Sequence, residues 1–378
     1  MATPRLLHLH SSFNPGGKEV RCVRLINGFG AAASHTIVSG VAGEMGAARA
    51  IAPGIAADLA PAFPPLQGRP TPARLKALAE AMRGFDLILT YNFGAMDAVM
   101  AHTLFGGAFG LAPLIHHEDG FNHDEIAARK PLRNWYRRIG LGRARGLVVP
   151  SLALERIALG EWHQPAARVH RIANGIDTAA YARKPRIDAL PRVIKRPGEK
   201  WLGTIAGLRA VKNLPRLVRA FAAMPDDWQL VILGDGPEKN AIREEALRLE
   251  VGHRVHLPGF VAEPASVIGL FDLFALSSDS EQFPISIVEA MAAGLAVASP
   301  AVGDVAAMVA DDNRPFITPV GDEAALGAAL AQLAGDKALR ARLGQANRAL
   351  ARAHYDDGQM REAYARLYGA ALGVGRLG

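Results

Sequence analysis

The chain has 378 residues, of which 50% are hydrophobic and 21% charged, the composition of a globular protein rather than a disordered one. This length suffices for two domains of roughly 150 to 200 residues, each with its own hydrophobic core. The formal net charge of +7 is compatible with nucleic-acid, membrane or phosphorylated ligands, so the positions of the basic residues must decide among them.

The apolar stretches and the single cysteine indicate the cellular compartment of the protein. The longest apolar stretches, near residues 104–115 and 290–302, are interrupted by Gly or Pro and are shorter than the roughly 20 residues that span a bilayer. The first ten residues resemble a short strand and lack an apolar signal core. Cys22 has no partner for an internal disulfide, which favours a reducing compartment. We therefore expect a cytoplasmic protein.

The basic excess is concentrated in one segment. Residues 129–145 contain no acidic residue and seven basic ones: Arg129, Lys130, Arg133, Arg137, Arg138, Arg143 and Arg145. Pro131 begins a predicted helix whose apolar residues recur at i, i+3, i+4 and i+7: Leu132, Trp135, Tyr136 and Ile139. In one interpretation, this amphipathic basic helix packs its apolar stripe on the N-terminal domain and keeps its arginines on a solvated face. In the other, the helix and its flanking arginines dock on the anionic inner face of the cytoplasmic membrane, and the two can hold together. We expect no nucleic-acid partner.

Short aliphatic runs alternate with helical patterns, which is typical of parallel sheets covered by helices. The predicted strands of the first half are residues 5–10, 35–39, 87–90, 114–116 and 147–150. Those of the second half are residues 201–206, 229–233, 254–257, 273–276 and 296–299. The fold class is therefore α/β, with two doubly wound, Rossmann-like domains.

Domain boundaries follow from a change in composition. Residues 177–200 contain three prolines and seven basic residues without clear periodicity, so we predict a linker there. The N-terminal domain is then residues 1–176 and the C-terminal domain residues 201–356. We expect the last segment, residues 357–378, to form a helix that packs back toward the N-terminal domain. Two facing domains of this kind would bind ligands in a cleft between the carboxyl ends of their strands.

Two acidic residues flank a predicted helix start in the second half. Glu281 follows the strand 273–276, and Glu289 lies in the next helix, which should begin near Pro284 or Ile285. Free backbone N–H groups at such a start can hold a phosphate, while the carboxylates can accept hydrogen bonds from hydroxyl groups. The alternative interpretation is a capping acid followed by a helix-surface acid.

Two cations and two glycine turns lie near other strand ends. Arg209 and Lys212 follow the strand 201–206, where they could clamp a diphosphate, although basic residues in a turn are usually solvated. Gly234 and Gly236 end the strand 229–233 in a tight turn that lets the backbone approach a ligand closely.

In order and spacing, these pieces resemble the retaining glycosyltransferases of family 4, which have the GT-B fold of two facing Rossmann-like domains. The resemblance covers nearly the whole chain. Its matching pieces are Asn14 to Glu19, Val149 to Ser151, Ala173 to Asp177, Gly207 to Arg209 with Lys212 and Asn213, Gly234 to Pro237, and Glu281 to Gly294.

The resemblance implies roles in binding a nucleotide-sugar donor. Arg209 and Lys212 would bind the diphosphate, and Glu289 would bind the ribose. Glu281 would hold the transferred sugar together with the backbone of Phe283, Pro284 and Ile285, which would also hold the distal phosphate.

Residues of the N-terminal domain would complete this site. Gly16 and Gly17 would let the first loop approach the donor phosphates. His116 or His117 falls where the family places a histidine that contacts the sugar. Because Arg and Lys carry the diphosphate charge, the resemblance implies neither a cofactor nor a metal. A metal site remains the alternative for a cluster of seven residues: His116, His117, Glu118, Asp119, His123, Asp124 and Glu125.

Three residues depart from the family pattern. Gln282 and Asp304 stand where glycine is common, and Ala307 stands where glutamate is usual. Because of these departures, the resemblance does not specify which sugar is transferred.

The implied reaction moves a sugar with retention from a UDP- or GDP-linked donor to a glycan or lipid-linked acceptor hydroxyl, in cell-envelope glycoconjugate synthesis. Alternatives are a nucleotide-sugar 2-epimerase of similar fold, a glycosidase-type carboxylate pair and an inactive sugar-nucleotide-binding protein.

Overall fold

A computed structural model describes residues 3–59, 62–121, 125 and 129–378. The chain divides into two compact units, one of Met1–Ala173 with Met360–Gly378 and the other of Asn174–Gln359. Residues 177–200, expected to form a linker, belong to the second unit, because Tyr181 and Leu190 are buried in its core. Within the described chain, no helix is both long and apolar enough to cross a membrane.

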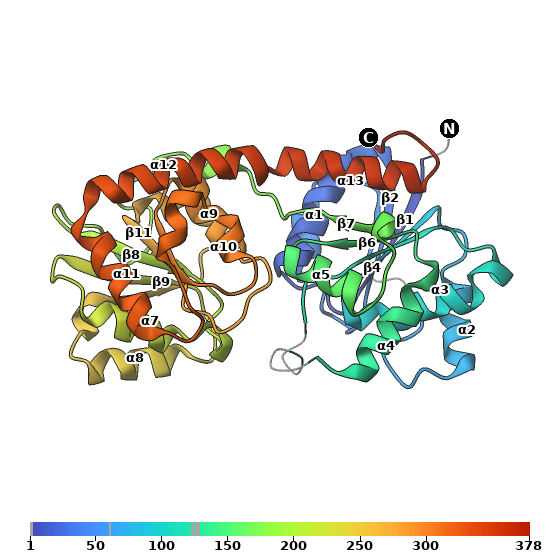
Figure 1. Cartoon of the computed structure of the whole chain (residues 1–378). Coiled ribbons are helices and arrows are strands. Elements are labelled where there is room, and N and C mark those ends of the chain that lie inside the picture. The colour runs from blue at the N-terminus through green and yellow to red at the C-terminus, as the bar shows by residue number, and fades with distance from the viewer. Residues whose placement is uncertain (1–2, 60–61, 122–124, 126–128) are drawn as a thin grey trace. The chain divides into compact units, whose positions relative to one another are not determined.

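The first unit contains a seven-stranded parallel sheet (Figure 1) in the order β3-β2-β1-β4-β5-β6-β7. Its strands are β1 (Arg5–His10), β2 (Ser34–Ser39), β3 (Ala57–Leu59), β4 (Leu87–Tyr91), β5 (Leu114–His117), β6 (Gly146–Val149) and β7 (Val169–Arg171). Its helices are α1 (Gly17–Phe29), α2 (Pro72–Ala81), α3 (Met96–Phe109), α4 (Pro131–Gly140), α5 (Leu152–Gly160) and α13 (Asp357–Ala371), which belongs to this unit from Met360 on.

Alternation along the strands gives this sheet two apolar faces. Leu7 and Leu9 of β1 pack in the same core as residues of α2, α3 and α5. Leu6, one position away, packs instead in the core that contains residues of α1 and of α13, including Tyr364 and Tyr368. Both faces are covered, which is why the strands appear in the sequence as continuous apolar runs.

The second unit repeats this design with six parallel strands in the order β10-β9-β8-β11-β12-β13. These are β8 (Lys200–Ile205), β9 (Trp228–Leu233), β10 (Val255–Gly259), β11 (Leu273–Ala275), β12 (Val297–Pro300) and β13 (Ile317–Thr318). The helices are α6 (Thr178–Tyr181), α7 (Leu214–Ala222), α8 (Lys239–Arg248), α9 (Ile285–Ala293), α10 (Val305–Met308), α11 (Glu323–Gly335) and α12 (Lys337–His354). Two Rossmann-like parallel sheets confirm the predicted α/β fold class.

Buried histidines of β1 and β2 lie close together. His8 Nε2 is 3.0 Å from His35 Nδ1, and His8 Nδ1 is 3.1 Å from the hydroxyl of Tyr91. The His10 ring stacks on Tyr91 with centroids 3.9 Å apart, yet its two nitrogens find no hydrogen-bond partner among the described residues. Burial, reinforced by neighbouring cationic groups, holds the pKa of His8 and of His10 well below 6.5.

Acidification should therefore destabilise the first unit. The folded-state pKa of these imidazoles lies below the unfolded value of 6.5, so the unfolded chain takes up the protons as the pH falls. The stability present above that pH is then lost progressively below it. Because His10 makes no hydrogen bond within the described chain, His10→Leu should keep the fold and reduce this loss by about 1.4 kcal/mol per pH unit.

Urea unfolding of wild type and His10→Leu at about pH 7.5 and about pH 5.5 measures the difference. The control is His163→Asn, an exposed histidine of the same unit at a positive φ that asparagine tolerates. The prediction is wrong if His10→Leu and wild type lose the same free energy of unfolding between the two pH values.

Candidate functional site

The strand order of the second sheet provides a position where a ligand could bind. β8 and β11 are neighbours, while the strands that follow each of them lie on opposite sides, so the strand order reverses between them. Loops leaving the carboxyl ends of two such strands diverge, and the gap between them is where open α/β sheets bind ligands. The loop after β8 carries Arg209 and Lys212, and the loop after β11 carries Glu281.

The loop after β8 is held by the glycine turn after β9. The Leu208 N–H donates to the Asp235 carbonyl at 2.9 Å, and the Glu238 N–H donates to the Leu208 carbonyl at 3.0 Å. Gly234 and Gly236 have φ of 143° and 154°, and a side chain at either would overlap the backbone of residues 206–208. The two loops thus pack backbone to backbone, which positions the start of the segment that bears both cations.

The two predicted cations differ in their environment. Arg209 is exposed and has no ion-pair partner within the described chain. Lys212 is largely buried and forms an ion pair with Glu281, whose side chain is likewise largely buried. The Ser278 hydroxyl donates to the same Glu281 oxygen at 2.7 Å. The structure therefore brings together two predicted residues that lie 69 positions apart.

The helix after Glu281 begins where the sequence predicts. α9 starts at Ile285, and its N-cap residue, Pro284, provides no side-chain hydrogen bond to the first turn. Backbone N–H groups of an uncapped first turn are available to an anion. Phe283 anchors this loop by an edge contact with Tyr355, whose ring centroid is 5.7 Å away.

Glu289 lies one turn further along α9 and is 8% exposed. It accepts a hydrogen bond of 2.7 Å from the Tyr181 hydroxyl. No local pattern indicates this contact, because Tyr181 is 108 positions away in the segment that we predicted to be a linker.

Two departures from the family pattern meet beside Glu281. The Asp304 N–H donates to the Gln282 carbonyl at 3.2 Å, so the turn at Gly303 and Asp304 supports the Glu281 loop. The Gln282 Oε1 atom is buried and has no hydrogen-bond partner among the described residues.

The predicted glycines of the first unit lie at a helix start. Gly16 is the extended N-cap residue of α1, and Gly17 is its first residue. No side chain caps this helix, so backbone donors are exposed here as well.

The two candidate histidines are entirely buried. His116 Nδ1 is 2.8 Å from the Thr90 hydroxyl, while His117 lies 3.1 Å from the Thr90 carbonyl and 2.8 Å from the Tyr368 hydroxyl. Burial holds the pKa of His117 well below its ordinary value. Neither ring is open to a ligand in this structure, so a sugar contact by His116 or His117 stays a prediction.

The alternative metal cluster is partly outside the described residues, which exclude His123 and Asp124. Its described carboxylates bind arginines instead: Glu118 and Glu125 pair with Arg137, and Asp119 pairs with Arg21. Within the described chain, the group close enough to hold a metal is a different one, His8, His10 and Cys22.

The amphipathic helix is α4, and its orientation differs from the simple expectation. Arg137, expected on the solvated face, is fully buried between Glu118 and Glu125. Tyr136 turns inward and donates to Asp97 at 2.7 Å. The other three apolar residues of the stripe are exposed: Leu132 by 84%, Trp135 by 59% and Ile139 by 50%.

Comparison with known proteins connects both units to one family. The model described as Glycosyltransferase Family 4 matches residues 15–180, and the model described as Glycosyl transferases group 1 matches residues 187–350. The N-acetyl-alpha-D-glucosaminyl L-malate synthase of Bacillus anthracis is 25% identical over 66% of this chain and 65% of its own. The phosphatidyl-myo-inositol mannosyltransferase of Mycolicibacterium smegmatis is 35% identical over 54% of this chain and 52% of its own. These matches span about half to two thirds of the relatives' length.

Solved structures share the fold over nearly the whole chain. Anabaena Alr3699/HepE, solved in complex with UDP, has a TM-score of 0.79 at 20% identity and covers 97% of this chain and 100% of its own. Sucrose-phosphate synthase from Thermosynechococcus elongatus has a TM-score of 0.77 at 20% identity and covers 98% and 99%. With both units matched by family models and the fold shared throughout, the chain belongs to glycosyltransferase family 4 and has the GT-B fold.

Proposed function

We propose that this protein is a retaining glycosyltransferase that moves a sugar from a UDP- or GDP-linked donor to a hydroxyl of a glycan or lipid-linked acceptor in cell-envelope glycoconjugate synthesis. The observation that carries the proposal is the pairing of Lys212 with Glu281 between the loops after β8 and β11, with Arg209 in the first loop and the uncapped start of α9 after the second. Cations, backbone donors and a carboxylate are what a nucleoside diphosphate bonded to a sugar requires.

The names of similar proteins support a nucleotide-sugar donor. Anabaena Alr3699/HepE was solved with UDP-glucose, and a mannosyltransferase of Mycolicibacterium smegmatis that is 30% identical over 54% of this chain is named as GDP-mannose-dependent. A relative from Rhizobium meliloti, 28% identical over 35% of this chain, is named for lipopolysaccharide core biosynthesis. This chain would therefore use one of these two nucleotide classes in related envelope chemistry.

In the proposed site, the Lys212–Glu281 ion pair neutralises both side chains when no donor is bound. A diphosphate would draw the Lys212 ammonium to its own oxygens, beside the Arg209 guanidinium, because it carries more charge than one carboxylate. Glu281, relieved of Lys212, could then accept hydrogen bonds from the sugar hydroxyls. Arg209 and Lys212 balance the diphosphate charge, so the proposal includes no metal.

The proposed reaction exchanges one bond for another at the anomeric carbon. The bond from that carbon to the distal phosphate oxygen breaks, and the acceptor oxygen bonds on the same face. The acceptor proton passes to a phosphate oxygen of the departing diphosphate, so no protein base is assigned. Arg209 and Lys212 would stabilise the charge that develops on the diphosphate.

Removing either cation should impair use of the donor. Arg209→Ala and Lys212→Ala each lose charge-assisted hydrogen bonds of roughly 1.5 to 3 kcal/mol, which corresponds to about ten- to a hundredfold in kcat/KM. The donor is first found by assaying a panel of UDP- and GDP-sugars with membrane extract as acceptor, and the anomeric configuration of the product by NMR tests retention. Arg243→Ala, an exposed arginine of the same unit, is the control. Wild-type kcat/KM in both variants would remove this assignment.

The two glutamates should have separable effects. Glu281→Gln should reduce sugar transfer strongly, because its proposed hydrogen bonds are to the reacting sugar. Glu289→Gln should chiefly weaken nucleoside diphosphate binding, and Tyr181→Phe should do so more mildly, since it removes only the 2.7 Å bond that orients Glu289. Calorimetry with UDP and GDP measures this. Equal affinity in wild type and Glu289→Gln would contradict the ribose role.

We also propose that the protein docks reversibly on the inner face of the cytoplasmic membrane through α4. Leu132, Trp135 and Ile139 are exposed on this helix, and the guanidinium of Arg138 lies 5.2 Å from the Trp135 ring centroid. Apolar and basic side chains together on one exposed helix are the features of an interfacial helix.

Vesicle binding should depend on the exposed arginines. Reversal of Arg138, Arg143 and Arg145 to Glu should weaken binding to phosphatidylglycerol vesicles about a hundredfold, since each basic residue contributes about 1 kcal/mol. Arg137 is unsuitable, because a carboxylate there would face Glu118 and Glu125. The control reverses three exposed arginines of the second unit, Arg243, Arg342 and Arg352.

Co-sedimentation at low and high salt provides the measurement, because salt screens such attraction. Membrane docking would be contradicted if wild type did not bind, or if its binding survived both high salt and reversal of Arg138, Arg143 and Arg145.

A further inference from the structure

A cavity lies in the first unit, at the carboxyl ends of β1 and β4. Its volume is about 450 Å³. β1 and β4 are neighbours in the sheet order β3-β2-β1-β4-β5-β6-β7, so the strand order reverses between them just as it does between β8 and β11. The cavity therefore occupies the position where a parallel sheet of this kind binds ligands. Ser11 follows β1, and Asn92 and Phe93 follow β4.

The backbone around the cavity is closely fitted. Asn92 has a φ of 56° and a ψ of 178°, a combination that residues other than glycine rarely adopt. Two positions later, a side chain at Gly94 would overlap the Cβ atom of Ser11. The Asn92 Oδ1 atom accepts a 2.8 Å hydrogen bond from the Asp119 N–H, which fixes the orientation of the Asn92 amide. Such strain is characteristic of functional sites.

Charges in the cavity wall are neutralised within the protein. Asp97 accepts hydrogen bonds of 2.7 Å from both Arg74 and the Tyr136 hydroxyl. Arg133 donates to Glu125 at 2.9 Å and stacks over Phe93, with its guanidinium carbon 4.8 Å from the ring centroid. A phosphate or carboxylate in the cavity would lie near the negative charge of Asp97, and no unpaired cation of the described wall residues would balance its own charge. The cavity therefore favours an uncharged ligand.

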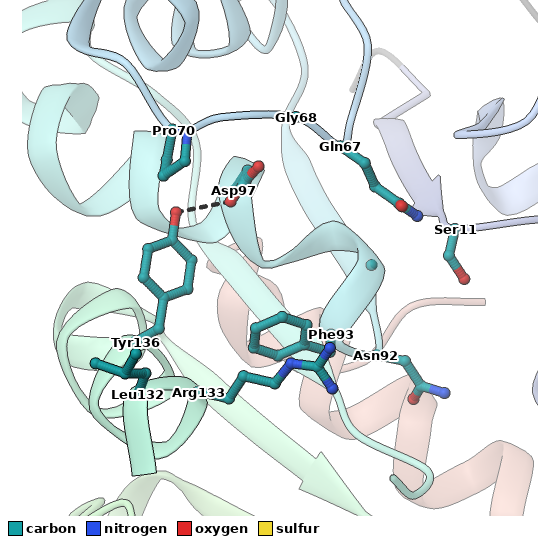
Figure 2. A pocket seen from close by; sticks show the side chains of 11 residues that line it. Ser11, Gln67, Gly68, Pro70, Asn92, Phe93, Asp97, Leu132, Arg133 and Tyr136 are labelled. Carbon is teal, nitrogen blue, oxygen red and sulfur yellow. Dashed lines mark hydrogen bonds between the residues drawn. The ribbon is translucent and has the colours of Figure 1, made fainter. Parts of the chain in front are cut away.

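The polar groups that remain suit hydroxyl groups. Ser11, Gln67 and Asn92 lie on one side of the cavity, across from Tyr136 and Leu132 (Figure 2). The Ser11 hydroxyl and the Gln67 amide make no hydrogen bond with other described residues, and the Asn92 amide keeps its two N–H donors. Hydroxyl and amide groups both donate and accept, as sugar hydroxyls do. Phe93 adds an apolar surface.

Leu132 connects the cavity to the exposed surface of α4. It lines the cavity and is 84% exposed, and Trp135 and Ile139 follow at i+3 and i+7 on the same helix face. A molecule whose head enters the cavity can therefore leave it over a row of exposed apolar side chains. This arrangement matches a ligand that is polar at one end and hydrocarbon at the other.

We infer that this cavity binds the uncharged sugar head of an amphipathic acceptor, whose hydrocarbon part lies over Leu132 along α4. The inference rests on the proposed glycosyltransferase function, for which it specifies the acceptor class. Ser11, Gln67 and Asn92 would bind the head-group hydroxyls. Leu132 would favour acceptors with an alkyl aglycone over those without one.

The test uses methyl and octyl glycosides of glucose, galactose, mannose and N-acetylglucosamine, below micelle-forming concentrations, with binding measured by saturation-transfer NMR. Wild type should bind at least one octyl glycoside about tenfold more tightly than its methyl counterpart. The double variant Ser11→Ala with Gln67→Ala should weaken both about tenfold. Leu132→Ser should abolish the preference for octyl, while Leu104→Ser, at a leucine 55% exposed on α3, should keep it.

UDP and GDP binding by calorimetry separates this inference from the proposed function. Failure of wild type to bind either nucleotide would overturn the proposed function, whereas the cavity is judged by the glycosides alone. Unchanged glycoside affinity in the double variant, or no binding of any of the eight glycosides to wild type, would overturn the sugar site. An octyl preference that survives Leu132→Ser would overturn the hydrocarbon path, and tighter binding of glucose 1-phosphate than of methyl glucoside would overturn the uncharged class.

Discussion

The reversal of strand order in each parallel sheet is the constraint on which the rest of the structure depends. Right-handed crossovers place successive strands on one side of the first strand and then on the other, so two neighbouring loops must diverge. In the second unit these loops follow β8 and β11 and bring Lys212 to Glu281. In the first unit they follow β1 and β4 and border a cavity. The sheet topology thereby gives each unit one position suited to a ligand.

Charge neutralisation then determines the character of each site. The cavity of the first unit is lined by acids and bases that already have partners, as Asp97 has with Arg74 and Tyr136. In the second unit Arg209 remains exposed without an ion pair in the described chain, and Lys212 has a partner that a stronger anion could replace. The first arrangement suits an uncharged ligand and the second an anionic one, because a buried charge must be balanced by the protein or by the ligand.

Much of the fold could be predicted from the sequence, and the strands that were not predicted share a physical reason. The missed strands, β3, β7 and β13, are all edge strands of two or three residues. β3 and β7 also contain no fully buried residue, so they lack the continuous apolar run that marks a strand buried on both faces. α4 illustrates a different limit. Its periodicity predicts one apolar stripe, but buried Glu118 and Glu125 draw Arg137 inward and leave Leu132, Trp135 and Ile139 exposed.

By itself the sequence determined the alternation of strands and helices, the family, and the residues at strand ends, because these depend on local spacing and on residue type. Tertiary structure alone decided which of those residues meet. Glu289 contacts Tyr181 across 108 positions, and His116 and His117 are enclosed by Thr90 and Tyr368 rather than open to a ligand. Such contacts depend on how distant segments pack, and a buried polar group takes whichever partner the packing provides, which no local pattern records.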